Sequence, residues 1–264
     1  MNRLKILKHF AEIAPVYRHV RTLDPEPIFA IKDILVKHKK WKKPLKIADI
    51  GAGTGRYTEL LIKILKPENV KTILVDASFE MLSVGKTHMG RYNAHFVNSL
   101  AEHLPFKNEV FDVIMVFNAI HHFDFKKFIR EARRILKTGG FIFIYTRTQE
   151  QNRNSIWGQY FPKFSEKEYR LFWKDELIKK IKRLKNFKVI SYIEFEYPRI
   201  STIDELLKKA FAKHYSTFYL YKDDEYAQAI EMFKENLMKY YEPDEQIIHT
   251  DENTLVGLRK ISRE

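Results

Sequence analysis

The stretch IADIGAGTGRYTEL, residues 47–60, runs from an apolar segment through three closely spaced glycines into a helical pattern. A strand, a glycine loop and a helix in this order are typical of nucleotide-binding folds. The dinucleotide fingerprint G-x-G-x-x-G needs its third glycine at position 56, where this chain has arginine. Two residues before the first glycine, Asp49 places a carboxylate at the end of the strand. That charge would repel a pyrophosphate but attract a ligand with an ammonium or sulfonium group.

Apolar strand patterns and amphipathic helix patterns alternate on both sides of this loop. The expected strands are 43–50, 70–78, 94–97, 110–120 and 141–146, and the expected helices between them are 54–65, 79–88 and 125–140. Regular alternation predicts a parallel sheet with helices on both faces, and its ligand lies beyond the carboxyl ends of the strands. The loops that should line one cleft therefore follow Ile50, Val75, Val97, Phe117 and Tyr145.

The helix expected over 125–140 ends in two glycines. Its last two residues are Gly139 and Gly140. Glycine readily adopts the left-handed conformation that ends many helices, so this pair predicts a carboxyl-terminal cap. A fifth strand, 141–146, should follow at once.

The sequence predicts three regions. Residues 1–40 form an N-terminal helical lead-in, with helices expected at 2–14 and 24–38, and residues 41–146 form the nucleotide-binding core. In residues 147–264 we expect an irregular connection (147–162), a helical segment (165–184) and two final strands (187–198 and 247–261). Helices at about 202–240 interrupt those two strands as a cap over the cleft. Their aromatic residues suit either a mobile lid or a static cap packed on the sheet: Phe211, Tyr215, Phe218, Tyr219 and Tyr221.

The composition excludes several classes of protein. The chain has 264 residues, 45% of them hydrophobic, which fits one large domain with an inserted cap. No apolar run approaches the roughly 20 residues of a membrane span, and the amino-terminal segment is too charged for a signal peptide. The lack of cysteine excludes disulfides, thiolate zinc sites and cysteine nucleophiles. We expect a cytoplasmic protein without a metal site.

The formal net charge of +13 has two explanations. A basic surface attracts nucleic acid through release of counterions. A Lys- and Glu-rich composition without cysteine is also typical of thermophilic proteins. The basic clusters at 38–43 and 179–185 lie in expected helix surfaces or loops, and no RNA-binding motif accompanies them. We therefore favour the second explanation and expect no specific nucleic-acid partner.

A second carboxylate, Asp76, ends the second expected strand, 25 residues after the first glycine. A carboxylate at this place can accept hydrogen bonds from both hydroxyl groups of a ribose. Together with the glycine loop, it indicates a ligand that contains adenosine.

Five segments carry a resemblance to a known family: FAEIAPVYRHVR, DIGAGTGRYT, LVDASFEML, LPFKNEVFDVIMVFNAIHHF and EARRILKTGGFIFI. In this order and spacing, over residues 10–146, they resemble class I S-adenosylmethionine-dependent methyltransferases of the type 11, ubiquinone/menaquinone-methyltransferase-like group. The resemblance implies a Rossmann-like α/β fold, with a mostly parallel seven-stranded sheet, helices on both faces and a helical cap. It also implies transfer of a methyl group from S-adenosylmethionine to a small organic acceptor, with S-adenosylhomocysteine as product.

The same resemblance assigns the cofactor site. The methionine part would be held by Asp49, Gly51, Ala52, Gly53 and Gly55, and the ribose by Asp76. Ala77 and Met81 would pack against adenine, and the backbone carbonyls of Asn118 and Ala119 would face the methyl-bearing end. The family commonly has an acid where this chain has Leu100, which leaves the Ala101 N–H to reach the adenine. We therefore expect somewhat weaker cofactor binding.

Residues near the acceptor are less clearly marked. His121 and His122 follow the central strand, where one of them is a candidate general base or both simply line the cleft. Tyr17 is a third catalytic candidate. The candidate substrate residues, which could instead tie loops together, are Arg21, Tyr145, Arg147, Tyr215 and Tyr219. Asp112 is expected to order the start of its strand, and Trp157 and Tyr160 to pack inside the cap.

Two other functions remain open. An RNA methyltransferase would suit the charge, but NAIHH follows the fourth strand in place of the Asn/Asp-Pro-Pro-aromatic motif used on base amines. A protein that binds S-adenosylmethionine without catalysis is also possible, because methyl transfer has no obligatory catalytic residue. The sequence leaves open whether carbon, nitrogen or oxygen is methylated, and the oligomeric state.

Overall fold

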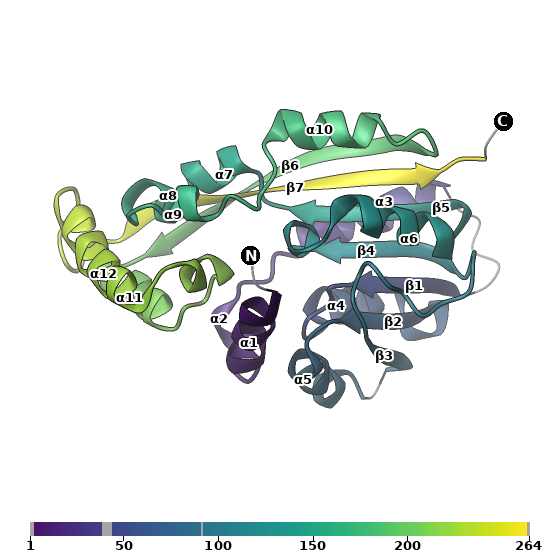
Figure 1. The fold of residues 1–264 in the computed structure, drawn as a ribbon, viewed down its shortest axis with the longest axis horizontal. Helices are drawn as coiled ribbons and strands as arrows, with labels where there is room; N and C mark the ends of the chain where they lie inside the picture. Colours follow the sequence, from purple (N-terminus) through teal and green to yellow (C-terminus); the bar gives the residue numbers. More distant parts are fainter. Residues whose placement is uncertain (1–2, 39–43, 91, 263–264) are drawn as a thin grey trace.

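A seven-stranded sheet forms the centre of the computed structural model, which describes residues 3–38, 44–90 and 92–262 (Figure 1). Most of the basic cluster at 38–43 and the expected boundary at 40/41 lie outside these residues. The strand order is β3-β2-β1-β4-β5-β7-β6. The strands are β1 (Leu45–Ile50), β2 (Val70–Asp76), β3 (Ala94–Asn98), β4 (Phe111–Phe117), β5 (Leu136–Thr146), β6 (Phe187–Ser201) and β7 (Ile247–Lys260). The first five pair in parallel, and β7 runs antiparallel to both β5 and β6. The predicted fold class is confirmed.

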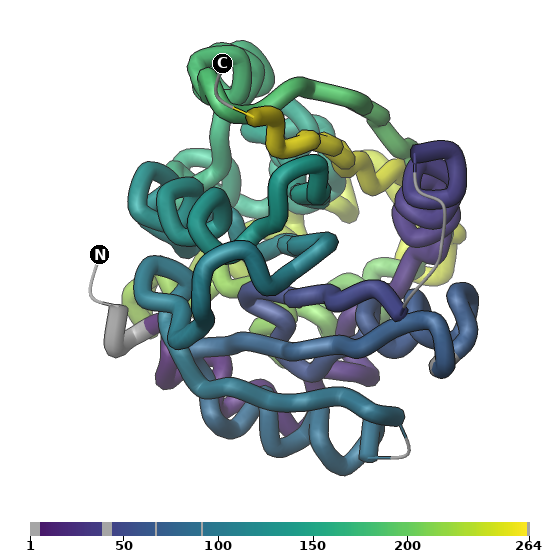
Figure 2. The backbone as a smooth tube through the Cα atoms, turned by 90° about the vertical axis from the view of Figure 1, so that its right-hand side faces the viewer, coloured from purple at the N-terminus to yellow at the C-terminus, as the bar shows by residue number. Residues whose placement is uncertain are grey.

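Helices cover both faces of the sheet (Figure 2). On one face, α6 (Phe125–Ile135) and α10 (Lys174–Lys182) pack Phe128 and Leu177 into a core with β4 and β5. On the other, α3 (Glu26–His38), α4 (Arg56–Leu65) and α5 (Phe79–Met89) contribute Ile31, Leu61 and Leu82 to a second core. The amphipathic patterns of these segments explain this arrangement, because each helix buries one apolar stripe.

The predicted end of the helix at 125–140 was wrong. Helix α6 ends at Ile135, and β5 begins directly at Leu136. The two glycines lie inside β5, where the register with β4 shifts between Phe111 and Val113. Gly139 has φ +78°, and a Cβ on Gly140 would lie 2.9 Å from the carbonyl oxygen of Asp112. The glycines thus permit a bulge and a close strand approach instead of capping a helix.

The long strands β6 and β7 extend past the parallel strands and support the cap (Figure 1). The cap contains α7 (Gln149–Asn154), α8 (Ile156–Tyr160), α9 (Phe164–Lys167), α11 (Ile203–Phe211), the 3-10 turn η3 (Ser216–Leu220) and α12 (Asp223–Met238). Two expectations for this region were inaccurate: 147–162 is largely helical, and helix covers only part of 165–184. Trp157 lies in the cap's own hydrophobic core with Phe218 and Phe233, as expected of a packing residue.

The remaining elements lie near the carboxyl ends of the parallel strands or connect them. Helix α1 (Arg3–Ile13) contacts both α5 and η3, and α2 (Tyr17–Val20) follows it. Two short 3-10 turns are η1 (Pro67–Asn69) and η2 (Ile120–His122). Among the described helices, none is long and apolar enough to cross a membrane.

Candidate active site

Two adjoining cavities lie at the carboxyl ends of the parallel strands, one of about 350 Å³ and one of about 140 Å³. The larger one lies over the glycine loop, and the smaller one lies under the cap. Their shared wall comes from α1, α2, α4 and the segment after β4: Phe10, Tyr17, Tyr57, Asn118, His121 and His122. A ligand in one cavity therefore borders a ligand in the other.

The glycine loop forms the floor of the larger cavity. Gly51 has φ +71°, and a Cβ there would lie only 2.5 Å from the Cβ of Ala119. The loop after β1 and the loop after β4 therefore touch at a point where only glycine fits. Gly53 has φ +54°, and its nearest neighbour to an added Cβ is the Met81 sulfur at 4.0 Å. Its lack of a side chain leaves backbone open toward the cavity.

Asp49 is a buried carboxylate with one unused oxygen. Its Oδ2 accepts a hydrogen bond from the Thr58 hydroxyl at 2.5 Å, whereas its Oδ1 has no hydrogen-bond partner among the described residues. Burial and the neighbouring Asp76 raise the pKa of Asp49 to about 7, against the opposing effect of Thr58. Buried polar atoms normally have partners, so a cationic donor from a ligand would complete this site.

Asp76 is held by backbone groups on both sides. Its Oδ2 accepts from the Gly53 N–H at 2.7 Å, and its Oδ1 accepts from the Ser78 N–H at 2.8 Å. Burial raises the pKa of Asp76, although these backbone hydrogen bonds oppose the shift. A carboxylate oxygen can accept more than one hydrogen bond, so both oxygens of Asp76 can still accept hydrogen bonds from the hydroxyl groups of a ligand.

Eleven of the twelve residues expected at the cofactor line the larger cavity: Asp49, Gly51, Ala52, Gly53, Asp76, Ala77, Met81, Leu100, Ala101, Asn118 and Ala119. The exception is Gly55, which caps the amino end of α4 with φ +72°. A Cβ on Gly55 would lie 2.4 Å from a side-chain carbon of Leu74 and 2.6 Å from the Met89 sulfur. This glycine serves the packing of α4 on the sheet.

The larger cavity also has lining residues that the motifs did not indicate. Ser99 and Glu102 flank Leu100 and Ala101, and Tyr169 and Arg170 reach the cavity from the cap side. The Glu102 carboxylate already accepts the Asp124 N–H at 2.8 Å.

The two histidines after β4 line both cavities. Burial, followed by Arg170 and Arg21, lowers the pKa of His121, and its Nδ1 has no hydrogen-bond partner among the described residues. Burial and the neighbouring His121 lower the pKa of His122, whose Nδ1 lies 3.4 Å from Arg170 Nη1. Both rings are neutral near pH 7 as a result. Tyr17 lines the same shared wall.

Three of the five candidate substrate residues line the smaller cavity: Arg21, Arg147 and Tyr215. Tyr145 does not, because its ring is buried in the sheet core and its hydroxyl donates to the Tyr197 hydroxyl at 3.2 Å. Tyr219 also lies outside both cavities, with its ring centroid 3.9 Å from that of His9. The candidate roles of Tyr145 and Tyr219 at the substrate do not agree with these positions.

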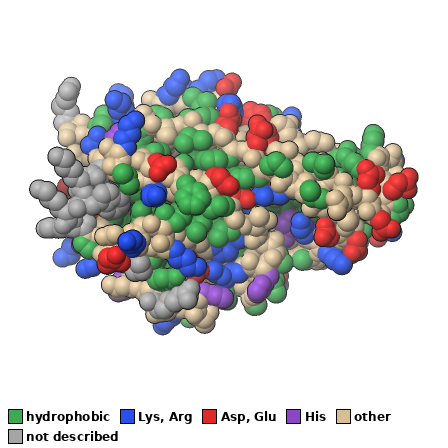
Figure 3. Space-filling model, turned by 180° about the vertical axis from the view of Figure 1, so that it is seen from behind, with side chains coloured by type: hydrophobic (Ala, Val, Ile, Leu, Met, Phe, Trp, Pro, Cys, Tyr) green, Lys and Arg blue, Asp and Glu red, His purple; other side chains and the backbone are tan. Residues whose placement is uncertain are grey.

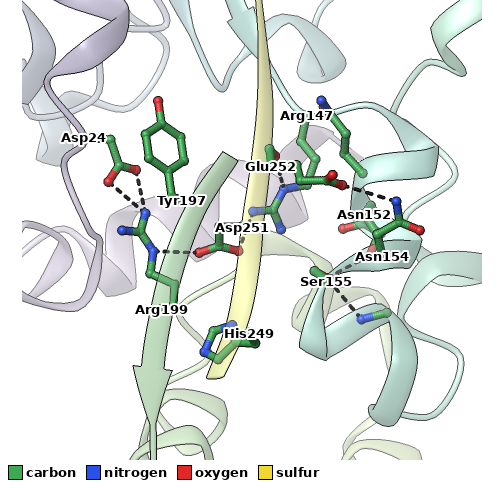
Figure 4. Close-up of polar contacts among 12 residues, drawn as sticks. Asp24, Arg147, Asn152, Asn154, Ser155, Tyr197, Arg199, His249, Asp251 and Glu252 are labelled. Atoms are coloured by element: carbon green, nitrogen blue, oxygen red, sulfur yellow. Dashed lines mark hydrogen bonds and ion pairs between the residues drawn. The ribbon is translucent and has the colours of Figure 1, made fainter. Parts of the chain in front are cut away.

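A chain of alternating charges forms one side of the smaller cavity (Figure 4). Asp24 accepts from Arg199 Nη2 at 2.7 Å, and Arg199 Nε donates to Asp251 at 3.3 Å. Asp251 also accepts from Arg147 Nη2 at 2.7 Å. Burial alone would raise the pKa of Asp251, but Arg147 and Arg199 hold it well below its ordinary range. Of these four residues the sequence indicated only Arg147, because the others lie in β6, in β7 and in the segment before α3.

Comparison with protein families matches residues 48–144 to a model described as a methyltransferase domain. The chain is 34% identical over 138 residues to the uncharacterized methyltransferase YcgJ of Bacillus subtilis, covering 50% of this chain and 51% of that protein. It is 32% identical over 167 residues to the uncharacterized protein MJ1123 of Methanocaldococcus jannaschii, covering 60% of this chain and 72% of that protein. The ubiquinone/menaquinone biosynthesis C-methyltransferase UbiE of Vibrio campbellii is 30% identical over 122 residues, covering 40% and 47%. The chain spans about half the length of the first two curated relatives that it matches.

Solved structures share the fold at low identity. The structure of Bacillus subtilis YcgJ has a TM-score of 0.61 and 19% identity, covering 91% of this chain and 100% of that one. Geranyl diphosphate methyltransferase in complex with GPP and sinefungin has a TM-score of 0.52 and 14% identity, covering 88% and 77%. These likenesses support the Rossmann-like arrangement of the sheet and its helices.

Proposed function

We propose that this chain, which matches a methyltransferase domain over residues 48–144, is a class I enzyme that transfers a methyl group from S-adenosylmethionine to a small organic acceptor. The observation that carries the proposal is the buried oxygen of Asp49 beside the glycine loop, which has no hydrogen-bond partner in the part of the chain that the structure describes. An ammonium group would satisfy this oxygen, whereas a pyrophosphate would meet a repulsive charge there.

The residues around the larger cavity fit the other parts of the cofactor. Gly53 leaves room for close approach of the methionine part, and Asp76 has acceptor capacity left for the two ribose hydroxyls. Met81 and Leu100 offer apolar surface to the adenine ring. When bound, the cofactor would supply an electrophilic methyl group, and the electron pair of the broken carbon–sulfur bond would remain on the sulfur of S-adenosylhomocysteine.

The shared wall of the two cavities supplies the side chains nearest to the methyl-bearing end of the cofactor. His121 and His122 are neutral, so an imidazole nitrogen can accept a hydrogen bond from the acceptor's O–H or N–H group and receive its proton. Their lowered pKa values make them weak bases, which favours orientation of the acceptor over strong proton abstraction. The cap and α1 enclose this region, and we infer that proximity in a dry site provides most of the rate enhancement.

The smaller cavity fits a small methyl acceptor better than a large methyl acceptor. Its volume of about 140 Å³ is close to that of a cavity known to hold benzene, about 150 Å³. Charged and aromatic side chains surround it, as expected for a small polar molecule with one oriented face.

The charge distribution also favours a small acceptor over RNA. On the face in Figure 3, Lys and Arg are interspersed with acidic and hydrophobic side chains, and acidic groups gather at the end that carries the cap. Proteins that track a nucleic-acid strand usually present a continuous basic groove with stacking aromatics. We expect only weak RNA binding that disappears at about 200 mM salt. Submicromolar, structure-selective RNA binding at that salt would instead favour RNA as the methyl acceptor.

Titration calorimetry tests the cofactor assignment. We expect binding of S-adenosylmethionine and S-adenosylhomocysteine and no binding of NAD. Asp76→Ala should weaken cofactor binding by about 1.5–3 kcal/mol, the usual contribution of hydrogen bonds to a charged group.

Asp112→Ala is the matched control. Asp112 is also a partly buried acid of the sheet, but it lies outside both cavities. Its carboxylate accepts hydrogen bonds from the Lys46 N–H and the Lys137 ammonium. This variant should bind the cofactor as the unchanged chain does. Tight NAD binding, or unchanged cofactor affinity in Asp76→Ala, would refute the assignment.

A further inference from the structure

Several residues that line the smaller cavity have a buried polar atom without a hydrogen-bond partner among the described residues. Four of its lining residues each have a buried nitrogen without a hydrogen-bond partner among the described residues: His9 Nδ1, His121 Nδ1, Arg147 Nη1 and His249 Nδ1. Buried polar atoms in native proteins are nearly always paired, with protein groups or with water. A polar ligand that reaches these nitrogens would complete their hydrogen bonds.

Most charges around the smaller cavity are balanced locally. The chain Asp24, Arg199, Asp251 and Arg147 contains two acids and two guanidinium groups. Glu168, a further acid of the lining, is paired with Arg170. These groups leave no net charge for a ligand to neutralise.

Arg21 is different because it faces the cavity without an acidic partner. Among the described residues it forms no ion pair: its guanidinium lies 4.5 Å from the Tyr215 ring centroid and 3.5 Å from the His214 carbonyl oxygen. Arg147 lies 5.8 Å from the centroid of the same ring, so the two guanidinium groups are near neighbours. Burial lowers the pKa of His9 and His214 to about 3, so neither adds positive charge near pH 7. Among the described residues that line this cavity, Arg21 is thus a half-buried positive charge without an acidic partner, whereas Lys209, the other lining cation outside the pairs above, is exposed.

We propose that the methyl acceptor is a small carboxylic acid whose single carboxylate binds between Arg21 and Nη1 of Arg147, the nitrogen that has no hydrogen-bond partner among the described residues. One negative charge neutralises Arg21, and the two carboxylate oxygens match the donors of guanidinium groups. A phosphate monoester would bring up to two charges close to Asp251, so a carboxylate is favoured. This inference rests on the proposed methyltransferase function and narrows its substrate class.

The carboxylate serves as the anchor of the acceptor. Arg21 and Arg147 line only the smaller cavity, whereas His121 and His122 line both. A molecule anchored at the arginines therefore directs its other end toward the cofactor. The methylated atom lies at that other end, beside the histidines.

Calorimetry on the full chain saturated with S-adenosylhomocysteine tests this inference. The probes are acetate, benzoate and indole-3-acetate, each compared with its uncharged amide. We expect at least one acid to bind about tenfold or more tightly than its amide, because hydrogen bonds to a charged group contribute about 1.5–3 kcal/mol. Arg21→Met and Arg147→Met should each abolish most of that preference, and Arg21→Lys should restore part of it.

Lys208→Met is the control for net charge. Lys208 is on α11, its side chain is 73% exposed, and its ion pair with Asp204 lies outside the cavity. Its loss should leave the preference for the acid unchanged. An unchanged affinity for S-adenosylhomocysteine in both arginine variants shows that they fold.

Three results would overturn the inference. They are equal binding of every acid and its amide, a preference that survives in both Arg→Met variants, and tighter binding of phenyl phosphate than of benzoate. Failure of the proposed function would look different, because S-adenosylhomocysteine itself would not bind.

Discussion

At the scale of single residues, Asp49 connects the sequence motif to the chemistry. The sequence predicts that Asp49 holds a cofactor ammonium, and its buried side chain lies at the larger cavity with one oxygen that no described residue contacts by a hydrogen bond. A buried carboxylate without a cation is costly to ionise, which is why its pKa rises to about 7. Cofactor binding and ionisation of Asp49 must therefore be coupled.

This coupling predicts a pH dependence. Below about pH 7 the free protein keeps Asp49 protonated, and a cationic ammonium must displace that proton to bind. Affinity for S-adenosylhomocysteine should rise from about pH 6 to about pH 8 and level off above, with proton release detected by calorimetry near pH 6. Asp49→Asn should remove both the affinity and its pH dependence. Affinity that stays constant over this range would disprove the coupling.

The same carboxylate should destabilise the ligand-free protein at high pH. Its pKa is raised on folding, so its favourable contribution is present at low pH and lost as the pH rises through about 7. The rise of the pKa from 3.8 to about 7 corresponds to about 4 kcal/mol at pH 8, and Asp49→Asn should recover part of it, roughly 1–3 kcal/mol, because the asparagine amide is still a buried polar group. Urea unfolding measures this change, and a less stable variant would contradict the account.

At the scale of elements, the junction of α6 and β5 shows why the helix at 125–140 was misplaced. Helical apolar spacing continues up to Ile135, and glycines commonly end helices, so local sequence favoured one long helix. Pairing of Leu136 with Phe111 instead draws the chain directly into the sheet. Pairing between strands that are 25 residues apart is a tertiary effect, which the local spacing of apolar residues cannot predict.

The two glycines of this junction should respond differently to alanine. A Cβ on Gly140 would lie 2.9 Å from the Asp112 carbonyl oxygen and 2.8 Å from a methyl group of Leu136, so the central strands would have to shift. A Cβ on Gly139 would meet only an Arg259 nitrogen at 3.7 Å, leaving the positive φ of 78° as its main cost. We expect losses of about 2–3 kcal/mol for Gly140→Ala and about 1 kcal/mol for Gly139→Ala in urea unfolding. A neutral Gly140→Ala would show that the junction is looser than described.

At the scale of the whole molecule, the two cavities differ in how far sequence could predict them. The larger one is built from loops that directly follow strands, so short motifs located Gly51, Asp76 and Asn118. The smaller one depends on contacts between distant segments, such as Arg199 with Asp24 across 175 positions. No local pattern marks such residues, because only the tertiary fold brings the segment before α3 next to β6.

The cap has its own hydrophobic core, separate from those of the sheet, and this supports movement as a unit. Phe218 and Phe233 are fully buried within that core, so part of the aromatic content of 202–240 serves packing. We predict that hydrogen exchange in 202–240 is fast in the free protein and slows when S-adenosylhomocysteine and benzoate are added. Uniform protection before any ligand is added would instead mean a static cap.

A crystal structure with S-adenosylhomocysteine tests the central claim most directly, because it places each part of the cofactor against a named residue. We predict that the amino group lies within hydrogen-bond distance of Asp49 Oδ1, that the ribose hydroxyls bind Asp76, and that the sulfur faces His121, His122 and the smaller cavity. A cofactor bound elsewhere, or one whose sulfur faces away from the smaller cavity, would contradict the account.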